Sequence, residues 1–350
     1  MNIHAFDINS ISEETKKLVD EANQVFIENQ GNEVWFGRCI FLSWYCSLGD
    51  CTFCYRSTQK HKIQHPREAR RTKASILTEV FLIKHLGWRL EFLTGGYGVY
   101  RMPELIDIAK NTSKIYGSKI WLNIGALGTD NLDAFQPYVK GVCASLETLN
   151  PDLHKKVAPS KSIEPFEKMF INASEKNYRK SMCIIIGLGE TKEDIKYLHE
   201  FISKYNLDRM TFYALNPVKG TPFSEGPDPE YYAWWIAKTR IAFPKMQIIA
   251  GTGFSRVREV ELLVRAGANA ITKFPATRFF ASKEAQMLEE GINKTGRRFT
   301  STLTKVPDLD WDKEVDDCDL DPELAAKIKI KLKSYLDMLR GKRDKIIIPV

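Results

Sequence analysis

The stretch SMCIIIG (residues 181–187) decides the fold class of this chain, because it is apolar at nearly every position. A strand that faces water on one side alternates apolar and polar residues, whereas a strand covered on both faces is apolar throughout. A segment with helical spacing follows at 192–204, and a second apolar run, RMTFYAL, follows at 209–215. This order predicts two parallel strands joined by a helix.

The same pattern extends over most of the chain. Six further runs are rich in apolar, β-branched or aromatic residues: GRCIFLS (37–43), RLEFLTG (89–95), KIWLNIG (119–125), GVCASLE (141–147), MQIIAGT (246–252) and ANAITKF (268–274). Helical spacing recurs between them, for example over 72–87. Eight strands alternating with helices predict one domain built on a (β/α)8 barrel of the TIM type, over residues 33–280. A doubly wound parallel sheet is the alternative.

Two helices are predicted outside the barrel. One leads into it at 11–30, and the other spans 321–341, with Asp321 as N-cap, Pro322 at the first position and Gly341 after the end. The second helix carries one apolar stripe, for which packing against the barrel is the favoured interpretation. Residues 281–350 are therefore predicted to be a C-terminal helical extension.

Composition excludes several classes of protein. The formal net charge is +7 and the charges are scattered, which favours a solvated surface over a nucleic-acid partner. The N-terminal sequence does not resemble a signal peptide, and no apolar stretch approaches the ~20 residues of a membrane span. The 7 cysteines do not form the even framework of a secreted scaffold. A cytoplasmic protein in a reducing compartment is expected.

The residues that end each run are unusually polar or glycine-rich. In a barrel of this type, catalytic and binding groups lie where the strands end, so these residues predict a polar mouth. Those singled out are Gly95, Gly96, Asn123, Glu147, Gly187, Asn216, Thr252 and Lys273, with Tyr213 and Arg278 as further pocket candidates.

The first run is followed by YCSLGDCTFCYR (45–56), with three cysteines at Cys46, Cys51 and Cys54. A structural zinc ion wants four ligands, and the nearby extra candidates are Cys39, His61 and His65, of which Cys39 falls inside an apolar run. Three thiolates instead suit a [4Fe–4S] cluster whose fourth iron stays open. Phe53, between the last two cysteines, would shield such a cluster from water. A cluster is favoured over zinc.

The cysteine loop resembles that of the radical S-adenosylmethionine (SAM) enzymes, and the resemblance extends over nearly the whole chain. It implies that the open iron chelates SAM and that electron transfer generates a 5′-deoxyadenosyl radical, which abstracts hydrogen from a small-molecule substrate in the barrel. It also implies an electron donor such as ferredoxin or flavodoxin.

Further motifs are similar to those of the biotin synthase, HydE, PylB and HmdB group. Thr94, Gly95 and Gly96 in LTGGYG would bind the amino group of SAM. Glu147 in SLETLNPDLHKKVAP would bind the ribose. Ile185 and Gly187 in CIIIGLGETKED would contact the adenine. Asn216 in ALNPVKGTPF and Asn123 would complete the cofactor site.

Two positions depart from the group's pattern, and no arginine stands where the group has a basic residue for the cofactor. Tyr97 replaces the usual acidic residue of the glycine motif, and Cys183 replaces a glycine of the adenine segment. The methionine carboxylate of SAM needs a basic group from the segment before the fifth strand, and Lys168 is the residue expected there.

Within the group, the resemblance is greatest to HmdB (HcgA)-type maturases of the iron-guanylylpyridinol cofactor of [Fe]-hydrogenase. Four residues separate Cys46 from Cys51, where the common spacing is three. EVWFGRCIFLSWYC (33–46), AGANAITKFPATRFF (266–280) and TLTKVPDLDW (302–311) also resemble that branch.

Other functions remain open. Sulfur insertion, as in biotin synthase, would need a second cluster inside the barrel. Strand alternation directs Cys143, Ser145 and Cys183 inward, and two thiols do not complete a cluster. A PylB-like mutase would need substrate-binding groups that the sequence does not identify. A non-catalytic iron–sulfur or zinc-binding scaffold is the alternative from a different class.

Overall fold

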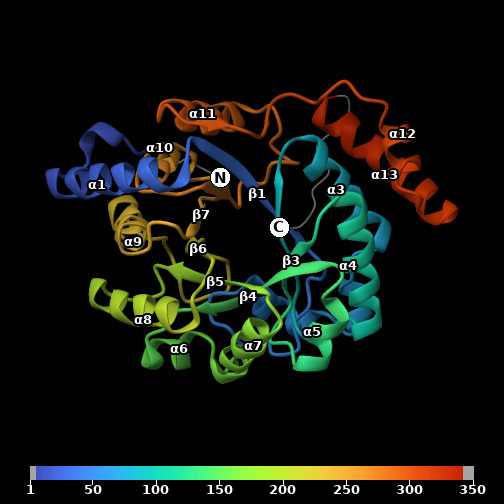
Figure 1. Cartoon of the computed structure of the whole chain (residues 1–350), viewed down its shortest axis with the longest axis horizontal. Helices are drawn as coiled ribbons and strands as arrows, with labels where there is room; N and C mark the ends of the chain where they lie inside the picture. The colour runs from blue at the N-terminus through green and yellow to red at the C-terminus, as the bar shows by residue number, and fades with distance from the viewer. Residues whose placement is uncertain (1–4, 342–350) are drawn as a thin grey trace.

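The computed structural model describes residues 5–341, and their backbone forms the predicted eight-stranded barrel (Figure 1). Its strands are β1 (Glu33–Phe41), β2 (Arg89–Thr94), β3 (Ile120–Asn123), β4 (Val139–Glu147), β5 (Arg179–Ile186), β6 (Arg209–Ala214), β7 (Gln247–Gly251) and β8 (Ala270–Thr272). Each strand pairs in parallel with the next, and β1 pairs with both β2 and β8, which closes the ring. The (β/α)8 prediction is confirmed, since a doubly wound sheet would leave two edge strands unpaired.

Helices cover the outside of the barrel (Figure 1). They are α3 (Lys73–His85), α4 (Met102–Tyr116), α5 (Thr129–Phe135), α6 (Pro151–Val157), α7 (Glu164–Glu175), α8 (Ile195–Tyr205), α9 (Pro229–Ala242) and α10 (Val260–Arg265), while the short α2 (Tyr55–Gln59) follows the cysteine loop. The helices expected at 72–87 and 192–204 are present as α3 and as α8 with a preceding 3-10 turn at Lys192–Asp194.

The sequence of β5 shows why these runs form barrel strands. Met182, Ile184 and Ile186 belong to the large core between the sheet and the surrounding helices. Cys183, pointing the other way, joins a separate cluster made only of strand residues, which is the barrel interior. Both faces of the strand are therefore buried, as its continuous apolar sequence predicts.

The extensions wrap the barrel from both ends of the chain. The leading helix α1 (Glu13–Gln30) packs against α9 and α10, and the C-terminal part contributes α11 (Lys283–Asn293), α12 (Trp311–Asp316) and α13 (Pro322–Leu339). The predicted end signals of α13 are confirmed, because Asp321 accepts the N–H of Leu324 at 3.0 Å and Gly341 has a φ of 70°. The buried stripe of α13 packs against α3.

A ninth strand was not predicted. β9 (Arg298–Phe299) pairs with the start of β1 outside the ring, and two residues are too few to give a sequence pattern. Residues 342–350 of the predicted extension and residues 1–4 lie outside the described residues. No helix within the described part of the chain combines the length and apolar character that crossing a lipid bilayer requires.

Candidate active site

The predicted mouth of the barrel is a cavity of about 360 Å³ at the carboxyl ends of the strands. Six of the residues expected to bind the cluster or SAM line it, together with three expected pocket residues: Phe53, Cys54, Thr94, Asn123, Glu147 and Ile185, and then Tyr213, Lys273 and Arg278. The rest of the wall is largely aromatic and basic, with Phe41, Trp44, Phe92, Arg38, Arg56 and Arg71. Residues from distant parts of the sequence thus converge on one cavity large enough for small molecules.

The cysteine loop packs directly against the glycine pair that follows β2. A Cβ at Gly96 would lie 1.9 Å from the carbonyl oxygen of Tyr45 and 2.7 Å from Cα of Cys46, so only glycine lets the two loops meet. The next backbone N–H, that of Tyr97, donates to Sγ of Cys46 at 3.4 Å. Such a donor stabilises a thiolate more than a thiol, which suits a metal-bound sulfur.

The three thiols of the loop are the type of ligand that a four-iron cluster takes. Cys46, Cys51 and Cys54 are free and partly buried. Burial raises the pKa of Cys51 to about 12, so a thiolate there needs the positive charge of a metal. No three Cys, His, Asp or Glu side chains among residues 5–341 gather closely enough to hold a single metal ion. A cluster spreads its ligands over separate irons and does not need that convergence.

Glu147 ends β4 in an unusual backbone conformation. Its φ is 67°, beside an irregularity in the pairing of β4 with β5, and such irregularities re-aim side chains. The carboxylate lies 2.5 Å from Nζ of Lys161, and each side chain is 10% exposed. Lys161 also donates to the carbonyl oxygen of Ser145 at 3.0 Å. Burial is the largest single influence on the pKa of Lys161 and lowers it, but the Glu147 carboxylate and the Cys51 and Tyr97 side chains together raise the pKa above its usual value.

Lys161 is the basic residue before β5 that the structure brings to Glu147, whereas Lys168, expected in this segment to bind SAM, lies elsewhere. Lys168 lies on α7 with its side chain 71% exposed, and it pairs with Glu164 on the same helix at 2.8 Å. The side chain of Lys161 could not be oriented from the sequence, because it lies in the irregular segment between α6 and α7. The one feature of the sequence that could have indicated Lys161 is its position shortly after the stretch that contains Glu147.

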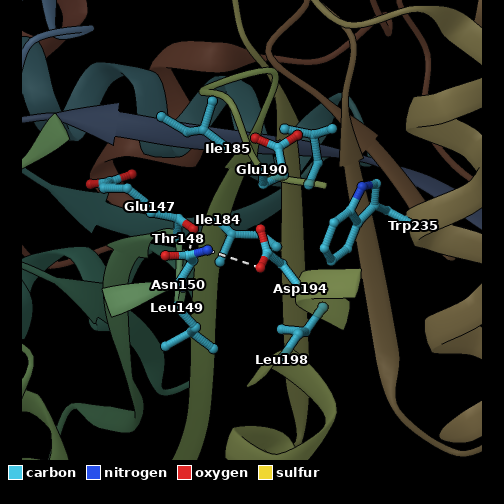
Figure 2. A pocket seen from close by; sticks show the side chains of 11 residues that line it. Glu147, Thr148, Leu149, Asn150, Ile184, Ile185, Glu190, Asp194, Leu198 and Trp235 are labelled. Atoms are coloured by element: carbon cyan, nitrogen blue, oxygen red, sulfur yellow. Dashed lines mark hydrogen bonds between the residues drawn. The ribbon is translucent and has the colours of Figure 1, made fainter. Parts of the chain in front are cut away.

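A second pocket adjoins the cavity behind Glu147 (Figure 2). Its volume is only about 10 Å³, room for about one water molecule, so it is not shaped for a ligand. Glu190, which lines this pocket, stabilises the turn after β5. Its carboxylate accepts the N–H of Gly187 at 2.7 Å and that of Leu188 at 2.9 Å. Asn150 donates to Asp194 at 2.9 Å, the hydrogen bond drawn as a dashed line in Figure 2. Ile185, which lines both pockets, is fixed by this turn.

The other expected residues lie around the cavity. Gly95 packs against Leu42, and Gly187 has a φ of 105°, which glycine adopts without strain. Asn216 is exposed and lines an open groove with Pro227 and Arg256, so the structure does not bring it into the cavity.

The barrel interior contains a buried carboxylate, Glu91, that the sequence analysis missed because it lies within an apolar run. Four side chains donate to it: Cys39 at 2.9 Å, Thr211 at 3.2 Å, Tyr213 at 3.0 Å and Thr272 at 2.7 Å. This network accounts for the burial of a charge-bearing group, since its oxygens are satisfied.

Two of the expected inward residues, Cys143 and Cys183, lie inside with their Sγ atoms 3.3 Å apart, and Ser145 lines the cavity. Cys39 is a third interior thiol, buried as predicted. Burial first, and then Glu91, raises the pKa of Cys39 well above its usual value, so it acts as a hydrogen-bond donor.

Comparison with known proteins agrees with this geometry. The profile of the Radical SAM superfamily matches residues 42–202, and that of the Biotin and Thiamin Synthesis associated domain matches residues 211–308. The chain belongs to the radical SAM superfamily. It is accordingly an enzyme that uses a [4Fe–4S] cluster and SAM and takes a small-molecule substrate in its barrel.

Several individual proteins are similar to this chain over most of its length. An uncharacterised protein of Methanocaldococcus jannaschii is 37% identical over 297 residues, covering 83% of this chain and 82% of that protein. The [FeFe] hydrogenase maturase subunit HydE of Thermotoga maritima is 26% identical, covering 73% of each chain. The 3-methylornithine synthase of Methanosarcina barkeri is 25% identical, covering 73% of this chain and 74% of that protein.

The solved structure of methylornithine synthase (PylB) shares the fold, with a TM-score of 0.66 at 21% identity, covering 77% of this chain and 80% of that one. The chain is thus related to HydE, PylB and biotin synthase.

Proposed function

We propose that this radical SAM enzyme acts in the biosynthesis of the iron-guanylylpyridinol cofactor of [Fe]-hydrogenase, as HmdB-type maturases do. The observation that carries this proposal is the cysteine loop, in which four residues separate Cys46 from Cys51. The HmdB branch lengthens the loop at the same place, typically by one residue more. The resemblance of residues 33–46 and 266–280 to HmdB supports the proposal. The similarity to HydE, a maturase of another hydrogenase, is consistent with it.

In this proposal, Cys46, Cys51 and Cys54 hold the cluster, and Phe53 excludes water from it. When bound, the cluster and SAM together supply a 5′-deoxyadenosyl radical by reductive cleavage of the sulfonium. Phe53 and Cys54 both line the cavity, which supports a cluster facing the substrate.

The chain's own residues bind and orient SAM. Glu147 accepts hydrogen bonds from the ribose hydroxyls, and Ile185 packs against the adenine. Lys161 binds the methionine carboxylate, because an ammonium has three N–H donors and its bonds to Glu147 and Ser145 use two.

The methionine amino group is bound by Thr94, Gly95 and Gly96, whose loop packs beside the cysteines. Asn123 faces the cavity and hydrogen-bonds to Ser145 at 2.8 Å, which holds its amide in place. The single electron comes from a donor such as ferredoxin or flavodoxin.

The test uses anaerobic protein reconstituted with iron and sulfide. With dithionite and SAM it should form 5′-deoxyadenosine, and a precursor of the guanylylpyridinol pathway should accelerate this and be consumed, as measured by mass spectrometry. Replacing Cys46, Cys51 and Cys54 by alanine should abolish cluster binding and turnover together.

Cys318→Ala is the matched control, since this cysteine lies far along the sequence, between α12 and α13, and should leave iron content and turnover unchanged. Cleavage of SAM that no pathway precursor stimulates would contradict the assignment to [Fe]-hydrogenase cofactor biosynthesis. A stoichiometric zinc in the active protein would contradict the cluster itself.

A further inference from the structure

The cavity is lined by carboxylates that all form ion pairs and by some cations that form none. Its two carboxylates both have partners: Glu79 lies 3.3 Å from Arg38 and 2.8 Å from Arg71, and Glu147 lies 2.5 Å from Lys161. Among the other cations that line the cavity, Arg56 has no carboxylate partner but donates to the carbonyl oxygen of Ser43 at 3.2 and 3.1 Å. Lys273 and Arg278 are different. Neither Lys273 nor Arg278 forms an ion pair with any carboxylate of residues 5–341, although both line the cavity.

The buried carboxylate of the barrel interior, Glu91, does not pair with Lys273 either. Glu91 is fully buried, and its carboxylate accepts four hydrogen bonds from uncharged side chains, among them Tyr213 and Thr272. It forms no ion pair with Lys273. The Lys273 ammonium therefore faces the cavity without a negative partner from the described protein.

The backbone of Lys273 is strained. Six residues other than glycine have a positive φ in the described chain: Glu147, Asn177, Asn206, Lys273, Ala281 and Asp319. Asparagine and aspartate tolerate this conformation, and Ala281 lies in a turn after the barrel. Glu147 (φ 67°) and Lys273 (φ 71°) remain, and both lie at the carboxyl ends of barrel strands. Strain of this kind concentrates at functional sites.

The two strained residues face each other across the mouth. Glu147 ends β4 and Lys273 follows β8, and in an eight-strand ring these strands are four apart in either direction. If the Glu147 side holds SAM, as proposed above, the Lys273 side is free for the substrate.

Aromatic rings hold Lys273 in position. Its Nζ lies 4.5 Å from the ring centroid of Tyr213 and 5.1 Å from that of Phe41. Ring faces stabilise an ammonium without accepting its N–H groups as a carboxylate would. The donors of Lys273 thus stay available to a ligand. Trp44 and Phe92 add further apolar surface to the same cavity.

We propose that Lys273, with Arg278 beside it, binds an anionic oxygen group of the substrate, a carboxylate or a phosphate, while the rings around it hold an apolar body. This rests on the proposed function only in assigning the Glu147 side to SAM. The substrate class is a small organic anion with an aromatic or otherwise apolar frame.

The test is calorimetric titration of the reconstituted protein, saturated with SAM, with three probes. They are 3-phenylpropionate, phenyl phosphate and the neutral 3-phenylpropanamide. At least one anion should bind about tenfold or more tightly than the amide, and which anion binds more tightly identifies the group. Lys273→Met should remove this preference, and Lys273→Arg should restore part of it. Arg278→Met should weaken it.

Lys168→Met is the matched control, because it removes an exposed lysine outside the cavity and should keep the preference for anions. Equal affinity for amide and anion in the unmodified protein would overturn the proposal, and so would an undiminished preference in Lys273→Met. Circular dichroism and SAM affinity, measured on the same samples, report whether the variant folds. Protein that prefers the anions but never cleaves SAM would contradict the proposed function and leave this inference standing.

Discussion

At the scale of single residues, the ion pair of Glu147 and Lys161 organises the proposed SAM side of the cavity. A buried charge is stable only when its partner stays in place, so each of these residues orients the other. The segment that leads to Lys161 also contacts the cysteine loop, since the N–H of Thr52 donates to the carbonyl oxygen of Val157 at 2.9 Å and Cys51 packs in one cluster with Val157 and Ala158. This segment thus connects the proposed cofactor contacts with the cluster ligands.

The two lysines at 161 and 168 give a direct test. Lys161→Met should weaken SAM binding by about tenfold or more, because it removes a charge-assisted hydrogen bond, which contributes about 1.5–3 kcal/mol, and leaves Glu147 unpaired. Equilibrium binding of SAM to the reconstituted protein measures this effect. Iron content should not change, since Lys161 is no cluster ligand.

Lys168→Met should bind SAM as the unmodified protein does, because its ion pair is exposed and such pairs contribute little. The reverse result, with Lys168 required and Lys161 dispensable, would restore the expectation drawn from the sequence and contradict the assignment of Lys161.

At the scale of elements, the loop between β1 and α2 must place three sulfurs while accommodating one residue more than the common spacing. Gly49 lies within this longer spacing and takes a φ of 52°, a conformation that glycine adopts without strain. Lys60 then donates to the carbonyl oxygen of Leu48 at 2.7 Å and ties the bulge to the segment after α2. Oδ1 of Asp50 is buried without a hydrogen-bond partner in the described chain.

Gly49→Ala should therefore loosen the cluster. The new Cβ would lie 2.3 Å from Cδ of Lys60 and 2.9 Å from the carbonyl oxygen of Cys46, in a conformation that costs an alanine about 1–2 kcal/mol. If this strain destabilises the loop with its cluster bound, a chelator should remove iron from the variant up to roughly tenfold faster than from the unmodified protein. Gly128→Ala is the control, since Gly128 has a φ of −76° and no atom near its would-be Cβ. Equal iron loss from both variants would mean that Gly49 does not carry the bulge.

At the scale of the whole molecule, α13 returns from the C-terminal extension to pack against α3. Leu332 is 1% exposed at this contact, whereas Ile330 on the same helix is 73% exposed. The extension is joined to the barrel through a continuous apolar core, which includes Leu332. Barrel and extension should therefore unfold together.

Denaturant unfolding tests this. Leu332→Ala should destabilise the protein by about 2–4 kcal/mol through lost burial and a residual cavity, and Ile330→Ala should change stability by less than about 0.5 kcal/mol. Tryptophan fluorescence and far-ultraviolet circular dichroism should report one common transition, shifted only in Leu332→Ala. A separate early loss of helical signal would show that α13 unfolds independently of the barrel.

The eight strands, the ends of α13 and the cysteine loop could be predicted from the sequence. Each of these is encoded locally, because burial on both faces makes a strand apolar throughout, caps lie within one turn of the helix end, and the three cysteines lie in one loop. The tertiary structure alone decided which charges meet. It brought Lys161 rather than Lys168 to Glu147, directed Cys39 to Glu91 and placed Lys273 across the mouth from Glu147. Cys39 and Glu91, like Glu147 and Lys273, lie far apart in the sequence, and the direction of the nearby Lys161 side chain depends on an irregular segment. Such geometry depends on strand register, irregular loops and residues with positive φ, which leave no periodic pattern in the sequence.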